Sequence, residues 1–101
     1  MLFLQTARHS PESCPTHNNE AKKVFGTFTA KMESLTKKHG IKVVGSWVSM
    51  PEHFVVTVCD APNQEAMLKY MMEPEVMAWS GYQVAETRLV LTLEEAAKFA
   101  K

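Results

Sequence analysis

Four short runs of β-branched and apolar residues divide this chain, and the stretches between them carry apolar residues at a different spacing. Runs of this length and composition, bounded by Pro, Gly, Asn and Asp, predict β-strands. The third run follows the second after only a short link at Pro51, so the two form a hairpin. The four strands are expected over residues 2–7, 41–49, 53–59 and 84–91.

Between these runs, apolar residues recur every three or four positions, which predicts helices with one buried stripe each. Asn18 and Asn63 stand where a side chain can cap a helix, and Gly40 and Pro74 stand where the helices must stop. Near the C-terminal end, Thr92-Leu93-Glu94-Glu95 has the spacing of a capping box. Helices are therefore expected over residues 19–39, 64–73, 75–79 and 93–99.

The order strand, helix, hairpin, helix, strand is that of the ferredoxin-like α+β fold. In this fold the four strands form an antiparallel sheet in the spatial order 4-1-3-2, and both helices cover one face. The length of 101 residues fits one domain spanning residues 1–101. A ferredoxin-like βαββαβ domain with a C-terminal helix is the predicted architecture.

Both faces of the predicted sheet carry too many apolar residues to face water. The mixed set Gln5, His9, His53 and Thr57 is expected to line the far face, and the more uniformly apolar set is expected to meet the helices. That second set is Leu2, Leu4, Phe54, Val56 and Val58. A second copy of the same sheet, related by a two-fold axis, would cover the far face.

With this element order, the sequence resembles the dimeric α+β barrel superfamily, in particular its small single-domain members without an assigned role. The superfamily includes small monooxygenases, haem-degrading enzymes, muconolactone isomerases and stress-responsive proteins. The resemblance covers nearly the whole chain and implies a homodimer. It does not carry a catalytic residue over, because one fold hosts unrelated chemistries.

Side chains able to bind a metal gather in the proline-stiffened segment after the first strand. His9, Cys14 and His17 lie there, and an antiparallel pairing of the first and third strands would bring His53 to the same end. Imidazoles with a thiolate suit Zn, Fe or Cu, and three protein ligands leave a position for water or substrate. A metal-binding protein, of the small oxygenase or redox type, is the first hypothesis.

Three other interpretations of these residues stay open. Cys14 could be a reactive thiolate near a helix start, or the histidines could hydrogen-bond the backbone while Cys14 fills a gap. The protein could also be a metal-free ligand-binding or interaction module, or a cofactor-independent monooxygenase or isomerase with His9 or His53 as base. Its pocket between the sheets would be lined by Gln5, Trp47, Trp79 and Tyr82.

Composition narrows the range of partners. The formal net charge is zero with a pI near 6.9, which gives no electrostatic footprint for nucleic acid. No apolar run approaches membrane-spanning length, and the first residues do not form a signal peptide, so a cytoplasmic protein is expected. Cys14 and Cys59 are the two cysteines, too few for a disulfide framework. Glu86 and Arg88 share one face of the last strand and are expected to pair.

Overall fold

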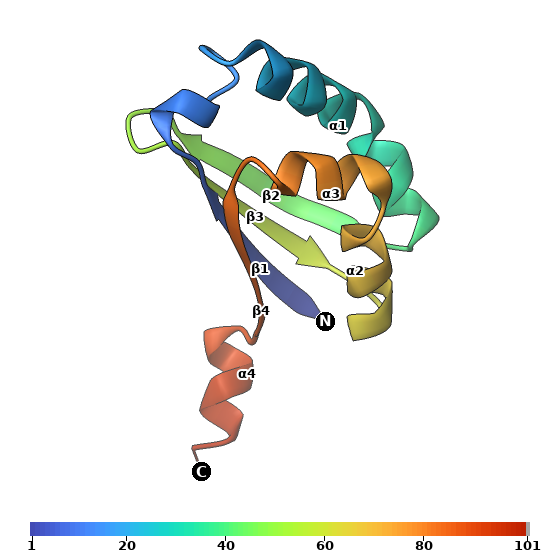
Figure 1. Ribbon diagram of the computed structural model, residues 1–101. Helices are drawn as coiled ribbons and strands as arrows, with labels where there is room; N and C mark the ends of the chain where they lie inside the picture. The colour runs from blue at the N-terminus through green and yellow to red at the C-terminus, as the bar shows by residue number, and fades with distance from the viewer. Residues whose placement is uncertain (101) are drawn as a thin grey trace.

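A four-stranded antiparallel sheet forms the centre of the protein, as the computed structural model of residues 1–100 shows (Figure 1). Its spatial order is β2-β3-β1-β4, which is the predicted 4-1-3-2 arrangement read from the other edge. The α+β ferredoxin-like fold is thereby confirmed. The strands are β1 (Leu2–Arg8), β2 (Lys42–Ser49), β3 (Phe54–Asp60) and β4 (Val84–Val90).

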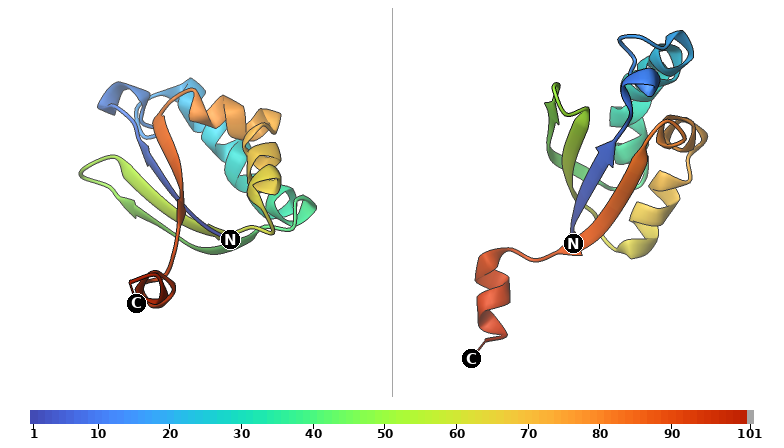
Figure 2. Two further views of the ribbon diagram at one scale, coloured as in Figure 1. Left: turned by 90° about the horizontal axis from the view of Figure 1, so that it is seen from below. Right: turned by 60° about the vertical axis from the view of Figure 1, so that its left-hand side comes forward.

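Three α-helices lie on one face of this sheet, and a fourth extends away from it (Figures 1 and 2). The expected break at Pro74 separates α2 from α3, because proline is tolerated only in the first turn of a helix. Among the described residues, none of the helices has the length and apolar character needed to cross a membrane. The helical elements are the 3-10 turn η1 (Pro11–Ser13), α1 (Asn19–Lys38), α2 (Gln64–Met71), α3 (Pro74–Ser80) and α4 (Leu93–Lys98).

The pairing of β1 with β3 fixes the end of the sheet where the candidate residues lie. The two strands run antiparallel with Arg8 opposite Phe54. One residue further, the His9 N–H donates to the His53 carbonyl at 3.2 Å. His53 was expected to open the third strand, but it belongs to the preceding turn with a φ of 53°. The two histidines are still neighbours, because the pairing continues one step beyond the strands.

The faces of the sheet are the reverse of the sequence-based expectation. The helices cover the mixed face, and the side with Leu4, Val56 and Val58 is left open. Phe3 and Cys59 are paired across β1 and β3 on the helix side, and both are buried. The buried core is made by Phe3, Ile41, Cys59, Ala61, Met67, Tyr70 and Val76.

Polar residues can occupy the helix-covered face because they bond to one another. The Gln5 Nε2 donates to Thr87 Oγ1 at 3.3 Å, and the Ser46 and Thr57 hydroxyls lie 2.8 Å apart. A buried polar group that keeps a partner avoids most of its desolvation cost. Average hydrophobicity was therefore the wrong guide to the buried face. The expected Glu86–Arg88 pair does form, on the open face.

The packing of the core predicts that substitutions at two adjacent residues of α2 have very different effects on the free energy of unfolding. Met67 is almost fully buried at 2% exposure, whereas Leu68 is 57% exposed. Replacing Met67 by Ala should lower the free energy of unfolding by about 2–5 kcal/mol, because the change leaves a cavity. Replacing Leu68 by Ala should change it by less than about 0.5 kcal/mol. Denaturant unfolding measures both, and equal losses would contradict the placement of α2.

Candidate metal centre

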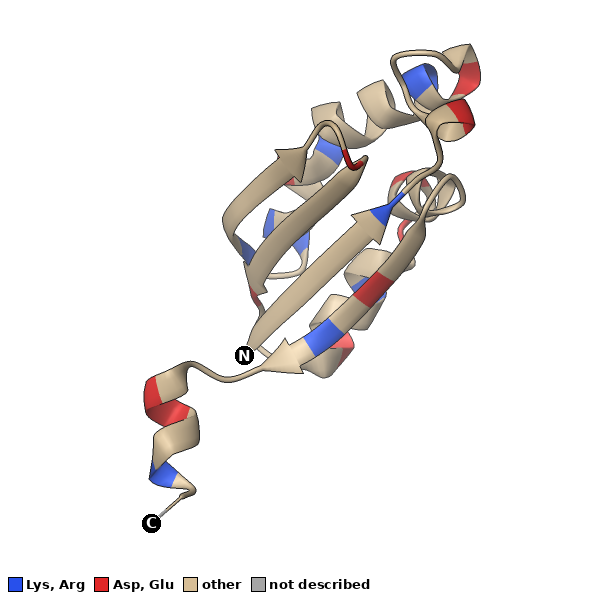
Figure 3. Ribbon diagram, turned by 90° about the vertical axis from the view of Figure 1, so that its left-hand side faces the viewer, with Lys and Arg blue, Asp and Glu red and all other residues tan. Residues whose placement is uncertain are grey.

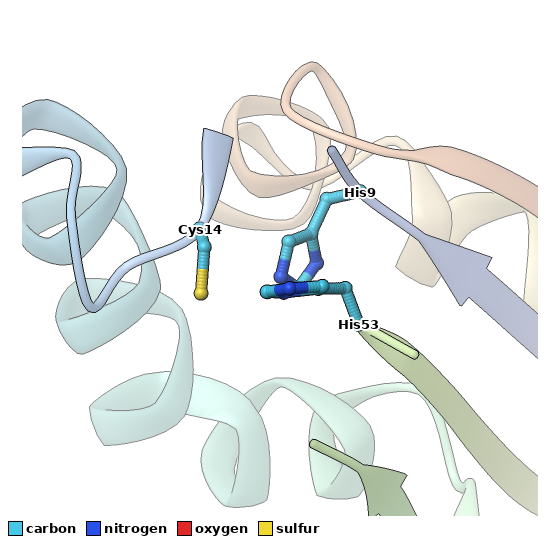
Figure 4. A group of neighbouring side chains, drawn as sticks. All are labelled: His9, Cys14 and His53. Atoms are coloured by element: carbon cyan, nitrogen blue, oxygen red, sulfur yellow. The ribbon is translucent and has the colours of Figure 1, made fainter. Parts of the chain in front are cut away.

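His9, Cys14 and His53 converge at one end of the sheet. One donor atom from each, a ring nitrogen or the thiol sulfur, lies within 4.8 Å of the other two. Figure 4 shows the two imidazole rings and the Cys14 side chain approaching one another from β1, from the loop before α1 and from the turn before β3. Cys14 is only 5% exposed, and both histidines are partly buried.

The loop structure explains why Cys14 points inward. Pro11 starts the 3-10 turn η1, and the Cys14 N–H donates to the Pro11 carbonyl at 3.2 Å. The Cys14 carbonyl then accepts the N–H groups of His17 at 2.9 Å and Asn18 at 2.8 Å. Asn18 caps α1 by accepting the Ala21 N–H at 3.0 Å. Both sides of Cys14 are thus tied to the backbone, which leaves its side chain fixed.

The immediate surroundings of the sulfur and of His9 are polar and aromatic. The Cys14 sulfur lies 3.0 Å from the Thr16 hydroxyl oxygen, in a hydrogen bond that either group can donate. The rings of His9 and His53 are 5.1 Å apart in an edge-on arrangement, and Trp79 lies 6.1 Å from the His9 ring. Within residues 1–100, the buried Nδ1 of His9 has no hydrogen-bond partner.

The electrostatics favour neutral imidazole at His9. Burial, and after it the nearby His53, lowers the pKa of His9 below its usual value. Neutral imidazole is the form that binds a metal, whereas the protonated ring has no free lone pair. Burial therefore favours the form of His9 that is able to bind a metal. It also argues against a purely structural role for the ring, because the buried nitrogen satisfies no backbone group.

His17 is not part of this group. Its side chain is exposed, although its backbone N–H helps to form the turn around Cys14. The spacing Cys14-Pro15-Thr16-His17 is short, so the thiol and the imidazole can share one ion only if the loop turns tightly. The turn does form, but it places the His17 backbone against Cys14 and leaves the ring outside. The structure thus brings three of the four expected ligands together.

The donor set fits a tetrahedral ion with one position left open. Zinc takes Cys sulfur at about 2.3 Å and His nitrogen at about 2.0–2.1 Å, which places tetrahedral donors about 3.3–3.6 Å apart. The observed donors lie within 4.8 Å of one another, so modest side-chain rotations would close the site. Three protein ligands with a free fourth position are typical of catalytic rather than structural centres.

The centre borders a cavity of about 410 Å³ that lies between the sheet and the helices. The pocket was expected between two sheets, so this expectation is wrong for the cavity that the chain encloses. The reason is the reversed face assignment, which turns Gln5, His9, His53 and Thr57 toward α1 and α3. The remaining walls come mainly from Phe25, Phe28, Met32, Tyr70, Val76 and Trp79.

The four expected pocket residues have different positions. Gln5 and Trp79 line the cavity. Trp47 borders it, but its side chain is 60% exposed and its ring lies over Gly45 on the open side of the sheet. Tyr82 is not among the lining residues, and its ring stacks on Trp79 at 6.2 Å. Tyr82 therefore supports the wall rather than forming it.

Sequence reasoning missed part of the cavity wall. The first helix was expected to have one buried stripe, and Phe25, Phe28 and Met32 on it line the cavity, with Phe28 also packed against the core. Gln83 also lines the cavity, and its buried Oε1 has no partner among the described residues. A signal for Gln83 existed, because the β1–β4 pairing of Arg8 with Val84 places it beside His9.

The chain belongs to the family described as a domain of unknown function, DUF3303, whose match spans residues 1–101. No curated protein matches it. Among solved structures it is similar to an uncharacterized NIPSNAP domain protein from Burkholderia xenovorans, with 11% identity and a TM-score of 0.47. That alignment covers 92% of this chain and 97% of the other.

The backbone at His53 predicts a stability difference between two substitutions. Its φ of 53° is a left-handed conformation that costs a side chain about 1 kcal/mol or more, and that glycine adopts freely. In metal-free protein, His53→Gly should be more stable than His53→Ala by about 1 kcal/mol in denaturant unfolding. At His39, where φ is −100°, glycine should give no such advantage over alanine. Equal stability of the two His53 variants would argue against the strained turn.

The second cysteine predicts a slow alkylation reaction. Cys59 is 0% exposed, and burial raises the pKa of its thiol to about 11. The thiolate is the reactive form, so at pH 8 folded Cys14→Ser protein should react with iodoacetamide at least about 100-fold more slowly than the unfolded chain. Mass spectrometry of timed samples measures this rate. Rapid labelling of the folded variant would mean that the core around Cys59 opens readily.

Proposed function

We propose that this protein binds a transition metal through His9, Cys14 and His53 and presents the metal's open position to the cavity. The observation that carries the proposal is the convergence of three donor atoms within 4.8 Å from three separate segments. The pairing of β1 with β3 and the His9–His53 backbone hydrogen bond fix the two histidines, and η1 fixes Cys14. Such convergence from distant positions supports a ligand set.

The ligand chemistry favours Zn, Fe or Cu over harder ions. Two imidazoles and a thiolate suit these borderline to soft metals, whereas magnesium and calcium prefer oxygen ligands. A bound ion would act as a Lewis acid or redox centre for a molecule at its open position. Iron or copper at this position would suit a small oxygenase or redox enzyme.

The cavity beside the centre favours a small and largely apolar ligand. Its volume of about 410 Å³ is in the range of small-molecule sites, and aromatic and thioether side chains form much of its wall. Among the described residues that border the cavity, only Glu86 carries a formal charge, and its carboxylate pairs with Arg88 on the open face of the sheet. The unpartnered Gln83 Oε1 could accept a hydrogen bond from a hydroxyl or N–H group of the ligand.

If His9, Cys14 and His53 bind the metal, substitutions at these residues should weaken metal binding, and substitutions at the other histidines should not. Protein made without a histidine tag should retain about one equivalent of Zn, Fe or Cu after dialysis. His9→Ala, Cys14→Ser and His53→Gly should each weaken Zn²⁺ or Co²⁺ binding by more than about 100-fold, since even the loss of a residue that only supports a ligand costs 10–100-fold. His17→Ala and His39→Ala, the matched controls, should leave the affinity unchanged.

Spectroscopy and alkylation give independent readouts of the same site. Co²⁺ should show a thiolate-to-metal charge-transfer band that disappears in Cys14→Ser, and bound Zn²⁺ should protect Cys14 from iodoacetamide. A loss of affinity in His17→Ala would show that the loop rearranges to include this ring. If the wild-type protein binds none of Zn, Fe and Cu, the proposal is overturned.

A metal-free role for the cavity is the second candidate function. It is favoured by the neutral state of His9 and by its buried Nδ1, which together offer a base or a hydrogen-bonding group to a bound molecule. This would suit a ligand-binding protein or a cofactor-independent monooxygenase or isomerase. Binding or turnover that persists in the presence of a chelator, and in Cys14→Ser, would favour this function over the metal centre.

We also propose that the protein is a homodimer, as the resemblance to dimeric α+β barrels implies. The open face of the sheet supports this proposal, because it carries the exposed apolar side chain of Trp47 on β2, beside Val56 and Val58 of β3. An apolar sheet face of this kind is stable in water only when it is covered. The near-zero net charge of the chain means that two copies do not repel each other.

A further inference from the structure

The C-terminal helix α4 projects from the far end of β4, away from both layers of the fold (Figures 1 and 2). Every residue from 91 to 100 is exposed, including Leu93 at 89% and Phe99 at 81%. These are the two most exposed large apolar side chains of the described chain. A segment that leaves such residues in water is expected to bury them against a partner.

The sequence of α4 specifies a helix with one apolar side. Leu93, Ala96, Ala97 and Ala100 follow helical spacing, and Phe99 lies at the edge of this side, about 120° around the helix from Leu93. Glu94, Glu95 and Lys98 lie on the other side. The start of the helix is fixed by a full capping box between Thr92 and Glu95. A helix of six residues is nevertheless too short to be stable alone in water, so its stability must come from packing.

The same chain has a second uncovered apolar surface, which is the open face of the sheet. Figure 3 shows that charged residues lie along β4 and at the strand ends, while the middle of β2 and β3 is free of them. In these two strands only Lys42 and Asp60 are charged, and they pair with each other in register at one end. The uncharged centre is formed by Val56, Val58 and Trp47 together with the bulge at Val44.

The two surfaces cannot meet within one chain as the structure stands. Only Leu91 and Thr92 separate β4 from α4, and Thr92 is held extended by the capping box, so the helix is directed away from its own sheet. In a dimer whose two open faces meet across a two-fold axis, an arm that leaves its own fold is free to reach the other copy. Such an arrangement covers both apolar surfaces twice and needs no other partner.

We propose that α4 is an exchanged arm, whose Leu93 and Phe99 side chains pack on the β2–β3 half of the open sheet face of a second copy. This inference rests on the proposed homodimer and adds the element that locks it. It also assigns a role to Trp47, whose exposed ring over Gly45 lies on that half of the sheet. Trp47 is then an interface residue and not part of the ligand site.

The first test is the oligomeric state of full-length variants by sedimentation velocity at several concentrations. Wild-type protein should be a dimer, and the double variant Leu93→Glu/Phe99→Glu should have a dimer dissociation constant raised by about 100-fold or more, because two large apolar side chains lose their burial. The controls Leu68→Glu and Met77→Glu change apolar residues that are 57% and 56% exposed on the helix side, and they should stay dimeric. All variants should keep the wild-type far-ultraviolet circular dichroism spectrum, which shows that a change of assembly is not a loss of the fold.

The second test locates the arm. A photo-crosslinker at position 99 in the dimer, formed from a mixture of isotope-labelled and unlabelled chains, should join peptides of different copies within residues 42–60. Crosslinks within one copy, or to α1–α3 of the other copy, would overturn the inference. The inference would also be overturned if the Leu93→Glu/Phe99→Glu variant dimerised as tightly as wild type. That result would mean a homodimer without an exchanged arm.

A monomeric wild-type protein would overturn both the arm and the homodimer. Metal binding is a separate readout, because the His9 end of β1 lies opposite to the end that carries α4. Leu93→Glu/Phe99→Glu should therefore bind Zn²⁺ with unchanged affinity. Failure of the metal proposal and failure of the arm proposal are thus distinguishable in one set of variants.

Discussion

The antiparallel register of β1 and β3 is the constraint on which the rest of the structure depends. It sets Arg8 opposite Phe54, and one further backbone hydrogen bond joins His9 to His53. A shift of one residue would move every side chain of β1 to the other face and would separate the two imidazoles. The same register turns Phe3 and Cys59 into the core. Fold stability and the geometry of the candidate centre therefore have one common origin.

Much of this arrangement could be predicted from the sequence, because local signals were consistent. The strand runs, the caps at Asn18 and Asn63 and the break at Pro74 determined the element order, and the order determined the sheet topology. Adjacency of His9 and His53 followed from topology alone. Residue spacing does not determine whether a loop side chain points toward the centre or into solvent. The exposed position of the His17 ring therefore became clear only from the geometry of the turn around Cys14.

The assignment of the two sheet faces shows where hydrophobic patterning stops being informative. The helix-covered face contains Gln5, Ser46, Thr57 and Thr87, whose side chains bond to one another, so it looked more polar than the open face. A pattern records the polarity of each residue but not whether a partner will satisfy it. A face destined for another chain can be as apolar as one destined for a helix, and a single sequence does not distinguish the two.

The strands also act as a spacer. The candidate metal centre lies just beyond Arg8, the last residue of β1. Helix α4 follows Val90, the β4 residue that pairs with Leu2 at the start of β1. Six residues of strand separate these ends, about 20 Å at the usual rise per residue. Substitutions so far apart, with no shared contacts, have additive energetic effects. Substitutions in α4 and substitutions around His9, Cys14 and His53 can therefore be combined with the effect of each unchanged by the other.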